Sequence, residues 1–239
     1  GLSRSELASW FGRANYVFKN RYLFTLTARA DGSSKFGANN KWATFPSAAF
    51  KWKIKEESFL QDVDGISDLG FRVSYGVTGN SSGFNAYTAQ YISGSVGTFY
   101  YNGQQIGAYG PNQAANPDLK WEKTATANIG VDFSILKGKI TGSVDVYDKK
   151  TTDMIFNYAV NPVLVPVGTI VANGGTMSNK GIEVSLGATP VKTANFSWST
   201  NLNLASNKNR IVKLTNPLFI GGDSIRRVQP DGGGQTGST

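Results

Sequence analysis

Two short segments of the sequence place acidic side chains close enough together to do chemistry. In DVDGISD, residues 62–68, alternate aspartates could direct several oxygen atoms at a calcium ion. The glycine comes too early for the helical calcium-binding loop, however, and the twelfth position holds Val73 instead of a glutamate. Glu56 and Glu57 could form a general acid and base, but adjacent side chains point apart and nothing nearby would shift either pKa. We therefore expect solvated turns at both segments and no metal site.

A third segment, DGGGQTGST at residues 231–239, has the glycine spacing of a phosphate-binding loop. Ser238 stands where the loop needs a lysine, and no strand-to-helix context precedes it. We interpret residues 215–239 as a loop and flexible tail. The sequence contains no cysteine and no histidine, which removes thiol nucleophiles, histidine-based triads and the usual zinc sites. These features predict no cofactor and no enzymatic activity.

The charge and the composition narrow the possible partners and the fold class of the protein further. Lysine and arginine number 24 against 16 aspartate and glutamate, which gives a net charge of +8, but the charges are scattered singly and form no basic run. We therefore expect no nucleic-acid partner. With 28 glycines and 12% aromatic residues, the 239-residue chain favours strands joined by turns over helices.

The strongest pattern in the sequence has a period of two. Between residues 121 and 135, apolar Ile129, Val131 and Phe133 alternate with polar Asn128 and Asp132. Similar alternation recurs in seven other segments, at residues 10–18, 22–28, 50–54, 71–77, 140–146, 182–188 and 196–204. The pattern predicts an all-β domain over residues 1–214 with about eight antiparallel strands.

The connections between these strands differ in length. Tight turns are predicted at 19–20, 137–138 and 190–195, and long polar or glycine-rich loops at 31–41, 79–117 and 149–178. If the strands run up and down, all the long loops lie at one end of the sheet. The link at 55–67 lies at the other end and carries a helical pattern in KEESFL.

Alternation alone does not say whether the apolar face meets lipid or the core of a soluble protein. Fifteen residues in extended form cover roughly 45 Å, and a strand tilted by about 40° still rises about 35 Å, enough to cross a hydrocarbon band of about 25 Å. Tryptophan and tyrosine gather near strand ends, as in proteins with membrane interfaces. These features favour a transmembrane β-barrel. The alternative is a soluble β-barrel or β-sandwich that acts as a binding or adhesion module.

Several segments together resemble the SusC/RagA family of TonB-dependent outer-membrane transporters. The resemblance rests on RADGSSKFG (29–37), FPS (45–47), VSYGVTGN (73–80) and NPDLKWE (116–122) in this order, and it extends from about residue 9 to residue 214. It implies a barrel of ~22 strands in the cell outer membrane, of which this chain supplies about eight. It also implies import of glycans, oligosaccharides or peptides together with a SusD-like lipoprotein. Contact with TonB is expected through an N-terminal part outside this sequence.

Two groups of residues follow as candidate sites. The resemblance also implies an N-terminal plug inside the barrel. If the polar face lines the lumen, the cations that would contact the plug or a passing solute are Arg13, Arg29, Lys51, Lys53 and Arg72. Aromatic rings in the longest loop stack well on sugars and peptides. The candidate substrate-binding residues are Phe84, Tyr87, Tyr91, Phe99, Tyr100, Tyr101 and Tyr109. For DGSSKFG, residues 31–37, we expect a structural corner.

Overall fold

The structure is a computed structural model that describes residues 3–163 and 165–214. The expected tail at 215–239, including the segment that resembles a phosphate-binding loop, lies outside the described residues. The described part contains no helix with the length and apolar character of a membrane span.

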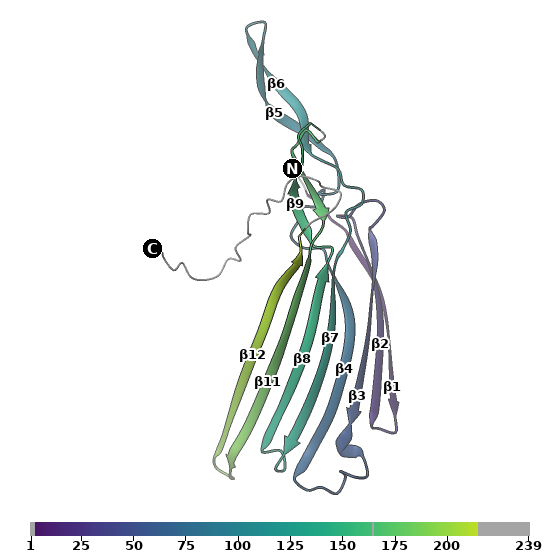
Figure 1. Ribbon diagram of the computed structural model, residues 1–239, viewed down its shortest axis with the longest axis vertical. Helices are drawn as coiled ribbons and strands as arrows, with labels where there is room; N and C mark the ends of the chain where they lie inside the picture. Colours follow the sequence, from purple (N-terminus) through teal and green to yellow (C-terminus); the bar gives the residue numbers. More distant parts are fainter. Residues whose placement is uncertain (1–2, 164, 215–239) are drawn as a thin grey trace, which may run out of the picture.

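One antiparallel sheet of eight strands makes up most of the molecule (Figure 1). Its strands, in spatial order, are β1 (Leu7–Phe18), β2 (Tyr22–Ser33), β3 (Trp42–Lys53), β4 (Ile66–Asn80), β7 (Glu122–Ile135), β8 (Ile140–Thr152), β11 (Thr176–Lys192) and β12 (Ser197–Lys213). The order follows the chain, so the sheet is an up-and-down meander. The all-β prediction and the eight predicted strands are therefore confirmed.

The long connections do lie at one end of the sheet, but two of them are not simple loops. The first contains the hairpin β5 (Ile92–Tyr101) and β6 (Gln104–Gln113), and the second contains β9 (Ile155–Ala159) and β10 (Thr169–Asn173). In Figure 1 the β5–β6 hairpin projects far beyond the sheet. The prediction of loops over 79–117 and 149–178 was therefore incomplete. We call this end of the sheet the long-loop end.

At the opposite end, which we call the tight-turn end, the chain turns with left-handed backbone conformations. Lys19 and Asn20 have φ of 48° and 53°, and Leu136, Lys137 and Gly138 also have positive φ. These values suit hairpin turns that match the right-handed twist of the strands. The helical pattern in KEESFL produces only a three-residue 3-10 helix, Ile54–Glu56, because the segment is too short to sustain a longer helix.

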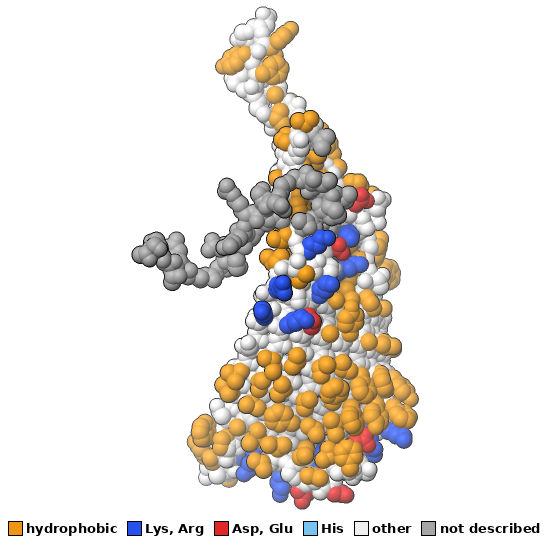
Figure 2. Space-filling view, viewed as in Figure 1, with side chains coloured by type: hydrophobic (Ala, Val, Ile, Leu, Met, Phe, Trp, Pro, Cys, Tyr) orange, Lys and Arg blue, Asp and Glu red, His pale blue; other side chains and the backbone are white. Residues whose placement is uncertain are grey.

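The cross-strand register gives the sheet two different faces. Ile129 lies opposite Val146, which lies opposite Ile182, so these side chains share one face. We call this the apolar face. Ile129 is 52% exposed, and no second layer covers this face within the described part of the chain. Figure 2 shows it as a broad apolar surface over the lower sheet. We call the opposite face, which carries Asn128 and Asp132, the polar face.

The tightly packed core lies at the long-loop end. Phe36, Phe45, Leu119 and Trp121 are each at most 5% exposed and contact one another. The β3–β4 ladder ends at Ser47 and Gly76, although both strands continue beyond these residues. The cluster packs beside this interrupted part of the sheet, because the Phe45 ring lies against the Cα of Gly79 on β4. The core therefore anchors the loops and does not lie beneath the apolar face.

Candidate functional site

The centre of the polar face carries a network of charged side chains from four adjacent strands. The Arg72 guanidinium on β4 donates two hydrogen bonds to the Asp132 carboxylate on β7, at 2.8 and 2.9 Å. It also donates to Asp145 on β8 at 3.1 Å. Lys51 on β3 donates to Asp132 at 3.1 Å, and the Asn128 amide donates to Asp145 at 3.1 Å. The charges of two cations and two carboxylates thus cancel within the network. Its hydrogen bonds connect β3, β4, β7 and β8.

Gly130 leaves the space in which this network forms. A Cβ atom at this position would overlap the Asp145 carboxylate and lie 2.9 Å from Nη2 of Arg72. Gly130 lies opposite Arg72 on one side and Asp145 on the other. Its missing side chain therefore lets the guanidinium cross β7 to reach β8.

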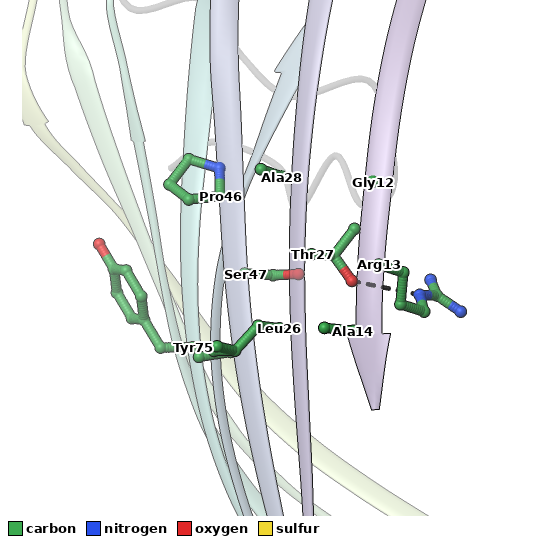
Figure 3. A pocket seen from close by; sticks show the side chains of 10 residues that line it. Gly12, Arg13, Ala14, Leu26, Thr27, Ala28, Pro46, Ser47 and Tyr75 are labelled. Carbon is green, nitrogen blue, oxygen red and sulfur yellow. Dashed lines mark hydrogen bonds between the residues drawn. The ribbon is translucent and has the colours of Figure 1, made fainter. Parts of the chain in front are cut away.

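The other candidate lumen cations lie on the same face but are less constrained. Arg29 on β2 donates to both carboxylate oxygens of Asp31 at 2.6 and 2.9 Å. Arg13 on β1 donates to the Thr27 hydroxyl at 3.2 Å, a bond drawn in Figure 3, and forms no ion pair among the described residues. Lys53 lies two residues beyond Lys51 on the same strand, so both side chains point to the polar face. The register therefore brings all five predicted cations to one face.

A hollow of about 630 Å³ on the other side of these strands is not a polar site. The side chains that form it on the apolar face include Ala14, Leu26, Pro46 and Tyr75 (Figure 3). Small residues on three neighbouring strands create the depression between the larger rings. Arg13, Thr27 and Ser47 also line the hollow, but the register places their side chains on the polar face. The hollow therefore belongs to the apolar surface.

Four of the seven candidate aromatic residues extend outward on the projecting hairpin. Phe99, Tyr100, Tyr101 and Tyr109 are between 50% and 81% exposed. The hairpin has two strands, and no third strand pairs with it within the described residues. Such an isolated ribbon leaves aromatic rings in water on both sides, which suits a surface that another molecule covers.

The other three aromatic residues lie nearer the sheet. The Phe84 ring meets the Phe36 ring edge-on at 5.4 Å and packs on the buried cluster. Tyr87 is 37% exposed, and its hydroxyl accepts a hydrogen bond from the Arg4 backbone at 3.3 Å. Tyr91 is 59% exposed at the base of the hairpin. Phe84 therefore holds the loop in place, whereas the hairpin rings remain free to meet a ligand or partner.

Two of the segments behind the family resemblance form a single buried joint. Gly37 in DGSSKFG donates its N–H to the Leu119 carbonyl in NPDLKWE at 2.9 Å, and a side chain at Gly37 would overlap the Pro117 backbone. The Trp121 indole N–H donates to the Lys41 carbonyl at 3.0 Å. These contacts agree with the structural corner expected for DGSSKFG. Trp121 itself is 3% exposed and not an interfacial aromatic, which the alternation alone did not indicate.

One carboxylate contradicts its sequence interpretation as part of a solvated turn. Glu57 accepts hydrogen bonds from the Tyr22 hydroxyl at 2.6 Å, from the Trp52 indole at 3.0 Å and from Arg21 at 2.8 Å. The bond from Tyr22, followed by the one from Trp52, lowers the pKa of the Glu57 carboxyl below its ordinary value. The expectation that nothing nearby would shift this pKa was wrong, because Tyr22 and Trp52, which lower it most, come from β2 and β3 and not from adjacent residues.

The described residues contain no cluster of three or more acidic, histidine or cysteine side chains arranged to hold a metal ion. At the centre of the polar face, Lys51, Arg72, Asp132 and Asp145 are already paired with one another through hydrogen bonds. The arrangement can bind and guide a polar solute, and the exposed rings can stack on one.

Comparisons with known proteins agree with this geometry. The family described as TonB dependent receptor-like, beta-barrel matches residues 2–234. TonB-dependent receptor SusC of Bacteroides thetaiotaomicron is 44% identical over 220 residues, which cover 89% of this chain and 21% of SusC. TonB-dependent receptor P39 of Formosa agariphila is 39% identical over 87% of this chain and 20% of its own length.

Solved structures of transporters and receptors match the same fold. The RagAB peptide transporter superposes with a TM-score of 0.78 at 30% identity over 88% of this chain and 22% of the transporter chain. The siderophore receptor PirA from Pseudomonas aeruginosa, at 15% identity and a TM-score of 0.54, shares the fold. The sequence spans about a fifth of the length of the curated relatives it matches. The chain belongs to the TonB-dependent receptor-like β-barrel family of the outer membrane, and its eight-stranded sheet is an antiparallel portion of such a barrel.

Proposed function

We propose that this chain forms part of the wall of an active importer that takes up glycans, oligosaccharides or peptides through TonB. The observation that carries the proposal is the continuous sheet with one apolar face, on which Ile129 is 52% exposed, and one face of paired charges. A wall of this kind separates lipid from an aqueous lumen. Residues 1–214 belong to the barrel, and the chain itself performs no covalent chemistry.

The polar face lines the lumen in this proposal. Arg72 and Lys51 hold the wall rigid through Asp132, because charge-assisted hydrogen bonds fix both side chains. Arg13, Arg29 and Lys53 keep more of their charge accessible and meet the plug or an anionic part of the solute.

The projecting β5–β6 hairpin meets the ligand and a SusD-like lipoprotein that covers the lumen. Its exposed rings supply apolar contact area at low entropic cost, which is how aromatic residues contribute to interfaces. RagAB is by its description a peptide transporter, and the similarity to it supports import of this class. The similarity to SusC supports the same architecture at higher identity.

The test uses the full-length protein in its own outer membrane. Uptake of labelled oligosaccharides and of labelled peptides is measured in cells with and without functional TonB, and co-purifying lipoproteins are identified by mass spectrometry. We expect TonB-dependent uptake of one class and one co-purifying lipoprotein. Replacing Tyr100, Tyr101 and Tyr109 with serine should reduce uptake at least tenfold.

The matched control is Tyr16→Ser. Tyr16 is 61% exposed, similar to Tyr101 at 67%, but it lies on the apolar face of β1. Uptake by the control should match the wild type. Uptake without TonB, or equal loss in the control and in the hairpin variant, would contradict the proposal.

A further inference from the structure

The apolar face ends abruptly in a group of cations on β7, β8, β11 and β12. We call this group the basic belt. Its members are Lys123, Lys150, Lys180, Lys208, Arg210 and Lys213. Figure 2 shows basic side chains above the apolar surface, toward the long-loop end. The belt therefore lies on the apolar face of the sheet and not on the face that carries Arg72.

The register orders the belt into three cross-strand rows. In the first row, Lys208 lies opposite Lys180, which lies opposite Asp148. The second row contains Arg210 and Lys150 on either side of Ser178. The third runs from Lys213 through two threonines to Lys123. Rows on one face are about 7 Å apart and strands about 5 Å apart, so the belt covers roughly 14 Å by 14 Å.

The belt is strongly positive and accessible. Six cations face one carboxylate, that of Asp148, which pairs with Lys180 at 2.8 Å. Both side chains of this pair remain exposed, at 66% for Lys180 and 49% for Asp148. Within the part of the chain that the structure describes, the other five cations form no ion pair. Like charges in adjacent rows repel, so the arrangement favours a bound anion between them.

The position of the belt beside the apolar face indicates that the anion is the phosphate of a lipid. The first row follows directly after the row of Ile129, Val146 and Ile182. A hollow of about 620 Å³ spans the boundary, with Ile129 and Val146 on its apolar side and Lys180 and Lys208 on its charged side. An acyl chain can lie against the apolar side while a phosphate of the same molecule reaches the cations. Free phosphate would use only half of this surface.

The two ends of the apolar face carry different kinds of side chain. At the tight-turn end, the face carries Trp52, Phe71, Phe133 and Trp198, the rings expected where a membrane meets water. At the long-loop end of the same sheet, β7, β8, β11 and β12 present cations at the corresponding boundary. The two boundaries of the apolar face beside these strands therefore differ in chemistry, with aromatic rings at one and the basic belt at the other.

We propose that the basic belt binds the phosphate groups of phosphorylated lipids in the leaflet at the long-loop end, which is the outer leaflet of the outer membrane. The inference rests on the proposed function in two respects, namely that the apolar face meets lipid and that the long-loop end, where the SusD-like lipoprotein covers the lumen, is the extracellular end. Bound lipid would hold β11 and β12 against the adjacent bilayer.

The test measures lipid retention by the detergent-purified full-length protein with native mass spectrometry. The probes are diphosphorylated lipid A and the same lipid after removal of both phosphates. We expect the wild type to prefer the phosphorylated probe at least tenfold. The triple variant Lys180→Gln, Lys208→Gln and Arg210→Gln should lower its affinity on the order of 100-fold, since each cation near a charged headgroup contributes about fivefold.

Two further variants sharpen the test. Lys149→Gln removes a neighbouring cation from the polar face, since Lys149 lies opposite Asn179 and alternates with Lys150, and it should leave the preference unchanged. Asp148→Asn removes the one carboxylate in the belt and should raise affinity several-fold. The preference of the wild type should also fall as salt is raised.

Two results would overturn the lipid site. One is equal retention of both probes by wild-type protein, and the other is an unchanged preference in the triple variant. Wild-type protein that inserts into the outer membrane and imports solute, yet shows no phosphate preference, would refute this inference alone. Wild-type protein that fails to fractionate with the outer membrane would instead refute the proposed function.

Discussion

Single residues decide which face of the sheet meets lipid, and a matched pair of substitutions tests this. Ile129 and Asn128 are adjacent on β7 and point to opposite faces. Ile129→Arg places a cation in the hydrocarbon region and should destabilise the folded barrel by about 2–4 kcal/mol. Asn128→Arg places a donor beside Asp145, which already accepts a hydrogen bond from Asn128, and should be tolerated.

The measurement is reversible unfolding of the full-length protein in lipid vesicles. Unfolding free energies that change equally in the two variants would contradict the assignment of the faces.

Gly130 provides a second prediction at this scale. Gly130→Ala places a methyl group against the Asp145 carboxylate and the Arg72 guanidinium, so at least one charge-assisted hydrogen bond must lengthen or break. We expect a loss of about 2 kcal/mol, the contribution typical of a hydrogen bond to a charged group. Gly12→Ala on β1 is the control, because a Cβ there meets no atom within 4 Å. The comparison uses the same unfolding measurement, and an equal effect at both glycines would show that the network contributes nothing.

The face on which several residues lie could be predicted from the sequence, because alternation fixes the face of each strand residue. The five cations predicted to line the lumen share one face for this reason. Trp121 and Glu57 could not be placed in this way. Trp121 immediately precedes β7, where loop residues and not pleat geometry decide burial. The partners of Glu57 are Tyr22 and Trp52, which come from neighbouring strands.

At the scale of elements, Glu57 joins the 3-10 turn to β2 and β3, which gives this joint a pH dependence. The lowered pKa means that the ionised form of Glu57 is favoured in the folded state. The joint therefore contributes stability above the ordinary value of 4.5, and loses it as the pH falls through the lowered pKa. In Glu57→Gln this dependence disappears.

The measurement is the melting temperature of wild type and Glu57→Gln across a pH series. We expect the wild type to be more stable above pH 4.5, and the difference to shrink as the solution becomes more acidic. Glu56→Gln, one residue earlier, serves as the control and should follow the wild type. A difference that is constant over the whole series would exclude a contribution from the ionised carboxylate.

Element prediction from the sequence succeeded for the sheet and failed for the hairpins in the loops. The eight sheet strands alternate clearly, although β3 starts at Trp42 and not at Phe50 because Pro46 and small residues obscure its first half. The β5–β6 hairpin was interpreted as loop because glycines interrupt its alternation. A signal was present, however: Asn102 and Gly103, with φ of 51° and 77°, form the Asn-Gly turn that is typical of tight hairpins.

At the scale of the whole molecule, the two inserted hairpins have different relations to the sheet. The β9–β10 hairpin is built into the core of the long-loop end, because Asn173 on β10 exchanges hydrogen bonds with the Lys120 backbone at 2.7 and 2.8 Å. Val171 and Ile155 also pack against the buried cluster. The β5–β6 hairpin instead projects away from the sheet in Figure 1 and exposes its rings.

This difference predicts opposite outcomes for two deletions in the full-length protein. Removing residues 94–110 and joining Ser93 to Pro111 through a short glycine linker should leave barrel folding intact, because those two residues are paired neighbours in the hairpin. Removing 156–172 should destabilise the barrel by about 3 kcal/mol or more, since it strips the hydrogen-bond partner from Asn116 and uncovers the buried cluster around Trp121. Heat-modifiable migration in gels reports folding in both cases. If the first deletion also prevented folding, the projecting hairpin would be needed for the folded structure. The exposure of its rings would then no longer support a role in binding a partner.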